Sequence, residues 1–291
     1  MFLPGALALV ALLGYGHGIR RPVTLTVAGP LPRPGQFPHR LLDGVLAAAV
    51  DDSGRVMYRA LNADPAELET YLTHLARVSP ARQPELFPTR GDSMAYWINA
   101  YNAFALTLAR DHYPRPPRRL DDPLGWTPGA AFALRRFEAG GRWLSLSDIE
   151  NGCLRARFRD PRLHLVLNCA SRGCPPLARA ALHPERCDEE LDAAVRRSLV
   201  SPWIFQADTA ARVVRLSALF RWYWADFRRD LPRDTALNLK VGNRALLTWL
   251  DPYLPADLSR RLRDGSAWRV EFLPWDWSLN EAPPPVRPGT P

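Results

Sequence analysis

The sequence contains almost no lysine, although it is basic. Of its 38 lysine and arginine residues only Lys240 is a lysine, and the 30 acidic residues leave a net charge of +8 over 291 residues. The arginines are scattered and often stand beside each other or beside an acid, as in Arg228, Arg229 and Asp230. A nucleic-acid-binding protein gathers its positive charge on one face or one helix. We therefore interpret the charge as a bias of composition and expect no nucleic-acid partner.

Common nucleotide and nucleophile motifs are also missing. The chain has no phosphate-binding loop, no dinucleotide fingerprint, no nucleophile-elbow serine and no internal repeat. We expect no cofactor. Zinc sites usually show tight cysteine pairs, for example with two residues between them. Cys169 and Cys174, flanked by His164 and His183, are more widely spaced, so the metal signal is weak and we expect no metal.

The apolar run at the start of the chain, residues 1–14, is too short for a confident transmembrane helix. It is typical of the hydrophobic core of a secretory signal, and the arginines that follow it would suit an uncleaved anchor. We predict that residues 1–18 export or anchor the protein, which places it in the periplasm or cell envelope with a membrane contact through this segment. A misassigned start or a buried N-terminal segment are the alternatives. Residues 19–38 contain five prolines and are predicted to be a linker.

The remaining composition suits a globular protein, since 47% of the residues are apolar and 23% are charged. Apolar spacing and capping residues predict helices over residues 39–50, 64–78, 94–110, 147–158, 186–200, 216–230 and 243–251. Strands are predicted over residues 55–58, 162–167 and 268–272, with a hairpin over 132–144 that turns at Gly140 and Gly141. The sequence thus predicts an α+β fold, a small sheet flanked by several helices, in a single globular domain over residues 39–280. A proline-rich tail, residues 281–291, follows.

Two local predictions concern the ends of this domain. The sequence Ser147-Asp-Ile-Glu150 is typical of a capping box at a helix start. The strand predicted over 268–272 is too short to be stable alone, so residues 275–280 behind it should belong to the same fold as the rest. Asp276 should then cap this segment or bind an arginine such as Arg155.

Several segments of the chain are similar, in order and spacing, to one family of bacteria and plants. These segments are Trp97–Asn102, Tyr113-Pro114, Leu146–Glu150, Leu154-Arg155, Asp160–Pro176, Leu216–Phe220, Tyr223, Asp226-Phe227 and Asp276–Asn280. From about residue 35 to residue 280 the chain resembles the domain of unknown function 547 family. Asn151 stands where the resemblance implies a histidine. The resemblance implies no reaction.

The segment from His164 to Cys174 carries the residues best suited to chemistry. Cys174 precedes Pro175, a favourable first residue for a short helix that would end at Ala181. A thiol at that N-cap feels the positive end of the helix dipole, which favours the thiolate. His164 would act as the base, and Glu150 on the preceding helix would orient it.

The candidate residues fall into two sets by role. The catalytic candidates are Cys174, Cys169, His164 and Glu150. Asparagine side chains can donate to an oxyanion or to a substrate. The candidates for that role are Asn168, Asn99 and Asn102.

Each cysteine has a structural alternative. Cys174 could be an inert buried thiol, or it could form a disulfide with Cys169. With Cys153 and Cys187 the chain has four cysteines, which in an exported protein can form two bridges in three ways.

The polar candidates have structural alternatives too. His164 could hydrogen-bond only within the core, and Glu150 could serve only the helix cap. Asn99 and Asn102 lie one turn apart on a predicted apolar helix, where an amide is costly unless it is hydrogen-bonded. We expect them to pin a neighbouring loop rather than to meet a ligand.

Two functions remain. The leading hypothesis is a cysteine-dependent hydrolase or acyl/amide transferase of the cell envelope. It requires Cys174 or Cys169 in an open cleft with His164 within hydrogen-bond reach. The alternative is a non-catalytic binding or scaffolding domain, in which both cysteines are sealed or bridged.

Overall fold

The computed structural model describes residues 30–113, 130–229, 239–264 and 268–283. The predicted export segment, residues 1–18, lies outside the described residues, as does most of the predicted linker and of the proline-rich tail. Within the described ranges no helix is both long enough and apolar enough to cross a membrane.

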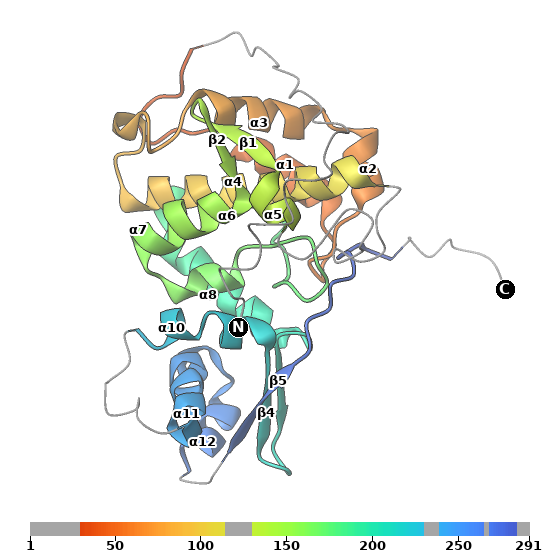
Figure 1. Ribbon diagram of the computed structural model, residues 1–291, viewed down its shortest axis with the longest axis vertical. Coiled ribbons are helices and arrows are strands. Elements are labelled where there is room, and N and C mark those ends of the chain that lie inside the picture. The colour runs from red at the N-terminus through yellow and green to blue at the C-terminus, as the bar shows by residue number, and fades with distance from the viewer. Residues whose placement is uncertain (1–29, 114–129, 230–238, 265–267, 284–291) are drawn as a thin grey trace, which may run out of the picture.

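Helices make up most of the fold (Figure 1). The α-helices are α1 (Arg40–Ala49), α2 (Tyr58–Ala63), α3 (Ala66–Arg77), α4 (Arg90–His112), α5 (Ala130–Leu134), α6 (Leu146–Asp148), α7 (Ala156–Phe158), α8 (Cys187–Val200), α9 (Ala218–Trp222), α10 (Trp224–Phe227), α11 (Leu239–Leu250) and α12 (Ala256–Arg263). The 3₁₀ helices are η1 (Pro84–Leu86), η3 (Pro161–Leu165), η4 (Pro184–Arg186) and η6 (Asp251–Tyr253), and η2 (Ile149–Arg155) is a π-helix. The strands are β1 (Arg136–Ala139), β2 (Arg142–Ser145), β3 (Phe205–Asp208), β4 (Val213–Ser217) and β5 (Arg269–Leu273).

Helix α4 runs through the middle of the larger part of the molecule, beneath α3 and the β1–β2 hairpin (Figure 1). It starts earlier than predicted because Thr89 and Asp92 form a reciprocal capping box, each side chain accepting from the other's backbone N–H. From Met94 to Ala109 its side chains are buried on all sides. A helix that is apolar all round needs neighbours on every face.

The predicted hairpin is confirmed. Strands β1 and β2 pair antiparallel, and Gly140 and Gly141 turn with φ of 56° and 72°. At Gly140 a side chain is also excluded by space, since a Cβ there would lie 2.2 Å from the Ser79 hydroxyl. The Gly140 N–H donates to the carbonyl of Leu75, which fixes the hairpin to the end of α3.

The second sheet has the strand order β3-β4-β5, with β3 antiparallel and β5 parallel to β4. The predicted final strand is therefore confirmed as β5, one residue later than expected. The helix predicted over 216–230 is interrupted at Tyr223 into the short helices α9 and α10. The whole is a single α+β globular domain, as predicted.

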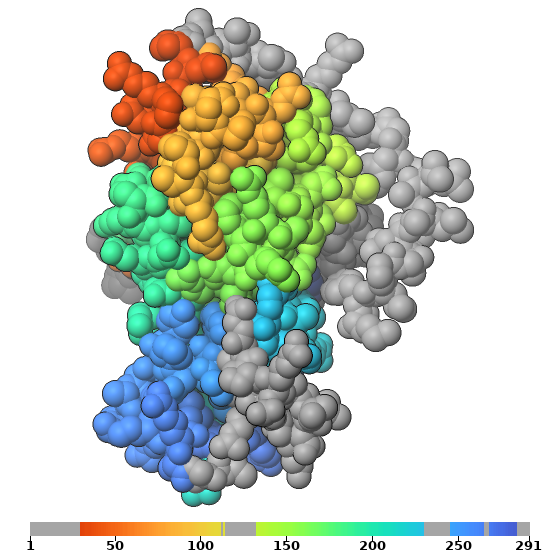
Figure 2. Space-filling model, turned by 90° about the vertical axis from the view of Figure 1, so that its left-hand side faces the viewer, coloured from red at the N-terminus to blue at the C-terminus, as the bar shows by residue number. Residues whose placement is uncertain are grey.

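Buried apolar side chains form two cores. The first core fills the larger part around α1, α3 and α4, and the second lies among α8, β4, α9 and α11. In Figure 2 the blue C-terminal residues form one end of the molecule, and the orange residues of α3 and the start of α4 lie toward the other end. Helix α8 joins the cores, since Leu191 packs in the first and Val195 in the second. The C-terminal segment does the same, with Trp277 against the first core and Trp275 against the second.

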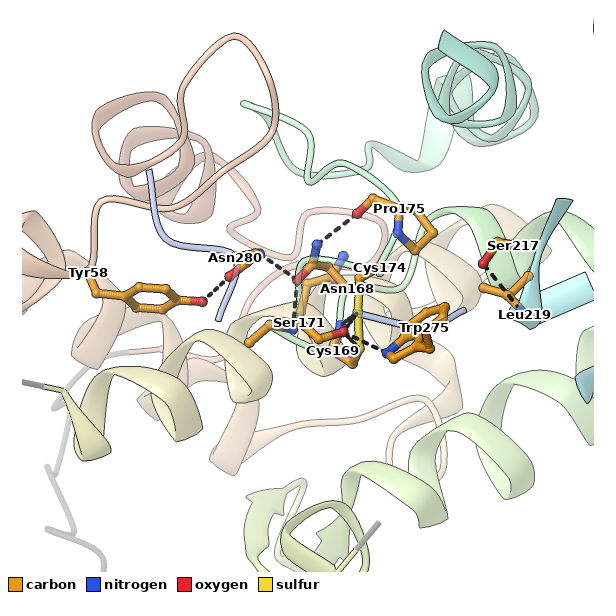
Figure 3. Close-up of a disulfide and its surroundings, with 12 residues drawn as sticks. Tyr58, Asn168, Cys169, Ser171, Cys174, Pro175, Ser217, Leu219, Trp275 and Asn280 are labelled. Atoms are coloured by element: carbon orange, nitrogen blue, oxygen red, sulfur yellow. Dashed lines mark hydrogen bonds between the residues drawn. A yellow bond between two sulfur atoms is a disulfide. The ribbon is translucent and has the colours of Figure 1, made fainter. Parts of the chain in front are cut away.

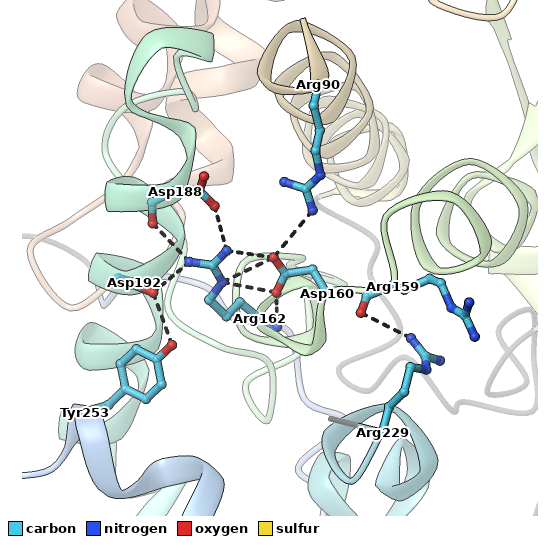
Figure 4. Close-up of polar contacts among 8 residues, drawn as sticks. All are labelled: Arg90, Arg159, Asp160, Arg162, Asp188, Asp192, Arg229 and Tyr253. Atoms are coloured by element: carbon cyan, nitrogen blue, oxygen red, sulfur yellow. Dashed lines mark hydrogen bonds and ion pairs between the residues drawn. The ribbon is translucent and has the colours of Figure 1, made fainter. Parts of the chain in front are cut away.

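Arg162 links η3 to α8 by ion pairs (Figure 4). Its guanidinium binds Asp160 and Asp188 at 2.7 Å and Asp192 at 2.8 Å. Asp192 also accepts a hydrogen bond from the hydroxyl of Tyr253, which comes from the C-terminal end of the molecule. Arg162, Asp192 and Tyr253 thereby connect η3 and α8 to η6, whose Tyr253 packs against the second core.

Several predicted local structures are wrong. At residues 55–58 there is no strand, since Val56 forms only isolated β-bridges and α2 begins at Tyr58. The strand predicted over 162–167 is absent: residues 161–165 form the 3₁₀ helix η3, because the Asp160 side chain accepts the Arg162 N–H and Pro161 takes the first helical position. The segment is buried on nearly all sides, which hides any helical period. The capping box is formed by Ser145 and Asp148 instead of Ser147 and Glu150, because an aspartate can serve at the third helical position.

Candidate functional site

The segment after η3 is closed by a disulfide between Cys169 and Cys174, whose Cα atoms are 6.1 Å apart. Cys174 is 5% exposed, whereas Cys169 is partly exposed. The helix expected from Cys174 to Ala181 is absent, since no helical residue lies in that stretch. The structure thus realises the disulfide alternative, and neither cysteine carries the thiolate on which the predicted nucleophile depends.

Two hydrogen-bond donors lie beside Cys174 Sγ, the buried sulfur of the disulfide (Figure 3). The backbone N–H of Cys169 donates to Cys174 Sγ at 3.0 Å, and the Ser171 hydroxyl lies 3.1 Å from both sulfurs. Ser171 is fully buried. Its oxygen accepts from the indole N–H of Trp275 at 3.1 Å. The C-terminal segment therefore contacts the disulfide through a side-chain hydrogen bond.

Asn168 forms the centre of a buried amide cluster, the Asn168 cluster, with Asn102, Asn280 and Tyr58. Its side chain donates to the carbonyl of Pro175 at 2.8 Å and accepts from Asn280 at 3.1 Å. Its oxygen also accepts the Ala170 N–H. Asn280 in turn accepts from the hydroxyl of Tyr58 (Figure 3). Asn168 is thus committed to the fold rather than free to bind an oxyanion.

The two asparagines of α4 hold loops, as expected. Asn102 accepts the backbone N–H of Asn168 and donates to the carbonyl of Val166. Asn99 exchanges hydrogen bonds with the backbone of Leu182 at 2.8 and 2.9 Å and donates to His39. Because both carboxamides pair with backbone groups, the structure agrees with the pinning role.

His164 belongs to a second polar cluster, the Asp226 cluster, with Asp226, Arg155 and Arg229. His164 Nε2 lies 2.8 Å from Asp226, and its ring stacks on Tyr223 with centroids 3.8 Å apart. Arg155 and Arg229 bind the two oxygens of Asp226, each at 2.7 Å. Of the two roles predicted for Asp276, the structure shows the cap, since its side chain accepts from the backbone and hydroxyl of Ser278, whereas Arg155 binds Asp226.

In the Asp226 cluster the negative charge lies on Asp226, and His164 is neutral. Burial lowers the pKa of His164, so the ring is neutral near pH 7. The hydrogen bond from His164 and the ion pair with Arg155 hold the pKa of Asp226 well below its usual range. Glu150 lies near enough to act on both aromatic rings: it raises the pKa of His164 against burial, and its hydrogen bond adds to burial in raising the pKa of Tyr223.

The predicted catalytic set is therefore only partly assembled. Glu150 acts electrostatically on His164, but Glu150 bonds Tyr223 and His164 bonds Asp226. Cys174 is engaged by Cys169 and Ser171 instead of by a histidine. The nucleophile, base and orienter do not form a connected triad in this structure.

The comparison with protein families covers this same region. The model described as protein of unknown function, DUF547, matches residues 87–199. These residues belong to the DUF547 family. The resemblance predicted from the sequence is confirmed over this segment. No curated protein and no solved structure matches the chain.

The DUF547 segment, residues 87–199, contains the disulfide, both α4 asparagines and His164. Several of their hydrogen-bond partners lie beyond it. Asp226 and Asn280 complete hydrogen bonds of this segment from outside, and Tyr58 in turn donates to Asn280. We did not predict these three as site residues. Two of them fall in stretches similar to the family, which was the available signal, whereas nothing near Tyr58 pointed to its role.

The π-helix η2 is an unusual element of the DUF547 segment. It carries Glu150 and Arg155, and its exposed Asn151 accepts from Arg155. π-Helical turns are rare and often occur at functional sites. Here the wide turn supplies a carboxylate to Tyr223 and a guanidinium to Asp226. Asn151 holds that guanidinium at the position where the family resemblance implies a histidine.

An open pocket lies beside the disulfide loop of the DUF547 segment. It measures about 320 Å³ and is lined by Trp203, Pro274, Trp275, Asp276 and Ser278. The loop forms its support: the N–H of Gly173 donates to the carbonyl of Asp276, and a Cβ at Gly173 would lie 2.9 Å from the Trp275 ring. The pocket thus combines tryptophan with a carboxylate and a hydroxyl.

The other cysteines are free thiols. Burial raises the pKa of Cys153 to about 11 and that of Cys187 to about 12, which keeps both protonated near pH 7. Among the residues that the structure describes, no group of three or more His, Cys, Asp or Glu side chains is placed to hold a metal ion.

Proposed function

We propose that the chain is a non-catalytic binding domain of the cell envelope, whose ligand occupies the pocket of Trp203 and Trp275. The observation that carries this proposal is that the Cys/His/Asn segment uses its polar groups within the fold. Cys169 and Cys174 form a disulfide, and the Asn168 amide donates to Pro175 and accepts from Asn280. Together with the bond from Gly173 to Asp276, these contacts hold the C-terminal segment that lines the pocket.

The pocket lining suits a saccharide. Trp203 exposes 40% of its surface, and an exposed indole offers a large rigid apolar face with little loss of side-chain entropy on binding. Asp276 and Ser278 line the same space. The Ser278 hydroxyl donates to Asp276, and the hydroxyl oxygen and the carboxylate can still accept hydrogen bonds that fix the orientation of a hydroxylated ligand. The volume of about 320 Å³ lies at the lower end of ligand sites, which span about 300–1,000 Å³.

The proposed envelope location rests on two features. Residues 1–18 have the composition of a secretory signal or anchor. Disulfides persist in oxidising compartments and are rare in the cytosol, so the Cys169–Cys174 bridge supports export. Fractionation of cells that express the full-length chain and a chain lacking residues 1–18 tests this. Full-length protein found wholly in the soluble cytoplasm contradicts it.

Titration calorimetry with a neutral oligosaccharide of N-acetylglucosamine tests the binding site. We expect saturable binding by the full chain and a loss of affinity of about tenfold or more in Trp203→Ala, because stacking on the indole is removed. Trp143→Ala is the matched control, since Trp143 is 45% exposed on strand β2 and lies outside the pocket lining. Equal affinity of both variants, or no binding by the unmodified chain, would reject the saccharide site.

A cysteine-dependent hydrolase or acyl/amide transferase is the second candidate, and the partial exposure of Cys169 favours it. Once the disulfide is reduced, Cys169 is the sulfur that a substrate reaches, while Cys174 stays buried. The test is the rate of iodoacetamide alkylation of the reduced chain against pH. An enzyme nucleophile should react with an apparent pKa well below the ordinary thiol value of about 8.5. Labelling at both cysteines that follows the ordinary value would rule this candidate out.

A further inference from the structure

We propose that the Cys169–Cys174 disulfide is a thiol–disulfide exchange site, attacked at Cys169 by an external dithiol, with Cys174 as the leaving group. The inference concerns the disulfide alone and does not rest on the proposed ligand pocket. Three observations carry it: the unequal exposure of the two sulfurs, the backbone N–H that donates to Cys174, and the buried Ser171 hydroxyl that Trp275 orients beside both sulfurs.

The two sulfurs differ in access. Cys169 is partly exposed at the surface of the loop, whereas Cys174 is 5% exposed. Exchange begins when a thiolate attacks one sulfur of a disulfide, and access decides which sulfur is attacked. An incoming thiolate therefore meets Cys169 first.

The buried sulfur is the one prepared to leave. Cys174 Sγ receives the backbone N–H of Cys169 at 3.0 Å, and this donor distinguishes it from Cys169. The Ser171 hydroxyl lies 3.1 Å from both sulfurs, so it can donate to Cys174 when that sulfur becomes the thiolate. A disulfide sulfur is a weak acceptor, so these donors contribute little while the bridge is closed. Against a thiolate the same contacts become charge-assisted hydrogen bonds, which are roughly twice as strong as neutral ones. The donors therefore favour the products of exchange over the closed bridge.

The orientation of the Ser171 hydroxyl is fixed by its neighbour. Trp275 donates its indole N–H to Ser171 Oγ at 3.1 Å, and Ser171 is fully buried. Because that oxygen already accepts from the indole, its own hydrogen is directed toward the sulfurs. The resulting chain runs from Trp275 through Ser171 to Cys174, and each donor in such a chain polarises the next.

The exchange takes place in two steps. A thiolate of the dithiol forms a bond to Cys169 Sγ, the bond between the two protein sulfurs breaks, and Cys174 takes the electron pair as a thiolate. The second thiolate of the dithiol then attacks its own sulfur in the mixed disulfide and releases Cys169 as a thiolate. Both cysteines take up the two protons that the dithiol has lost. The dithiol is oxidised to a disulfide, and the protein gains two electrons and two protons.

Trapping with glutathione tests the direction of attack. The oxidised full chain is incubated without denaturant in reduced glutathione, quenched with acid and digested, and the mixed disulfides are mapped by mass spectrometry. We expect glutathione on Cys169 in at least about tenfold excess over Cys174, since attack follows access. Adducts mainly on Cys174, or a bridge that opens only when the chain is unfolded, would overturn the proposal.

The variant Ser171→Ala tests the leaving group. Loss of one hydrogen bond to a charged sulfur should slow the reduction of the bridge by dithiothreitol about tenfold or more. Ser198→Ala is the matched control, because Ser198 is equally buried but donates to backbone carbonyls on α8 and at Leu165. Circular dichroism verifies that both variants fold. Equal reduction rates in the two folded variants would contradict the role of Ser171, and if Ser171→Ala does not fold, Trp275→Phe, which removes the indole N–H, must show the slowing instead.

Discussion

The Asn168 cluster and the Asp226 cluster do the same task with opposite chemistry. Each joins the DUF547 segment to a part of the chain far away in sequence: Asn168 to Asn280, and His164 to Asp226. The first cluster is neutral and fully buried, while the second balances a carboxylate between two half-exposed arginines. Amide contacts depend on shape and not on pH or salt, whereas an ionised cluster depends on both. The Asn168 cluster, the neutral joint between distant parts of the chain, should therefore be insensitive to pH and salt. The Asp226 cluster, the charged joint, should respond to both.

The largest effect is expected at the neutral joint. Asn168→Ala leaves the Pro175 carbonyl, the Asn280 amide and the Ala170 N–H without their partner in a dry interior. We expect the free energy of unfolding to fall by about 3–5 kcal/mol, because several buried groups lose their bonds at once. Chemical denaturation at pH 7 and pH 5 should give the same loss at both values.

Asn62→Ala provides the control for this substitution, because Asn62 is exposed and donates one long bond to the carbonyl of Tyr113. Its cost should stay within about 0.5 kcal/mol. A comparable loss in both variants would remove the distinction between a buried amide hub and an ordinary asparagine.

At the charged joint we expect a smaller loss that depends on pH. Asp226→Asn removes the charge that faces Arg155 and Arg229 and should cost about 2–3 kcal/mol at pH 7, since two arginines lose their counter-charge. The pKa of Asp226 is depressed in the folded protein, so its stabilisation is complete above the unfolded pKa of about 3.9. It is lost as the pH falls from there through the folded pKa, and the two proteins should converge in acid.

Asp257→Asn is the matched control, because Asp257 pairs with Arg260 on the exposed helix α12. Exposed pairs contribute about 0–1 kcal/mol. A pH-independent cost of Asp226→Asn would show that shape and not charge maintains this joint.

His39 is a titratable group among neutral side chains, and its effect on stability should therefore depend on pH. It contacts Asn99 and Tyr71 at 3.0 Å, and burial lowers its pKa to about 3. Below the unfolded value of about 6.5 the unfolded chain binds a proton that the folded chain refuses, so stability falls by about 1.4 kcal/mol per pH unit down to the folded pKa. His39→Gln should remove this part of the slope, and His74→Gln should largely keep it. Parallel slopes in His39→Gln and the unmodified chain would mean that His39 titrates normally.

The smallest effect is expected where the loop meets the C-terminal segment. A methyl group at Gly173 would lie 2.9 Å from Trp275 and 3.0 Å from the Asp276 nitrogen, so Gly173→Ala should cost about 1–3 kcal/mol by overpacking. At Gly152 an added Cβ meets nothing within 4 Å, so Gly152→Ala should stabilise the helical turn by about 0.5–1 kcal/mol. Thermal unfolding of both variants measures the contrast, and equal shifts would argue against a tight contact at Gly173.

Local signals in the sequence were sufficient for much of the fold. Helix α4 follows from apolar spacing, the hairpin from a double glycine at its turn, and strand β5 from the alternation of charged and apolar residues at 269–272. Each of these signals lies within a short stretch of sequence. The pinning role of Asn99 and Asn102 followed from the cost of an unpaired amide in an apolar helix. These inferences need no knowledge of which distant residues meet.

The site itself required such knowledge. The choice between a free and a bridged Cys169 depends on the loop geometry, and His164 could have faced either a thiol or a carboxylate. In the structure His164 faces the carboxylate of Asp226, which lies 62 residues further along the chain. The error at residues 162–167 had another cause, because a segment buried on nearly every side shows no period that separates a strand from a 3₁₀ helix.

The position of Asn280 has a consequence for the order in which the protein can be made. Tyr58 and Asn280 are 222 residues apart, and Val56 pairs with the backbone of Asn280 and Ala282. A ribosome that has released the helices of the first core still holds Trp277, which packs against that core, and Asn280, which bonds Tyr58 and Asn168. Until those residues emerge, Tyr58 and Asn168 lack their bonds to Asn280, and the apolar side chains against which Trp277 packs lack that cover. Helices α1 to α8 must therefore wait for the last part of the described chain before they reach their final packing.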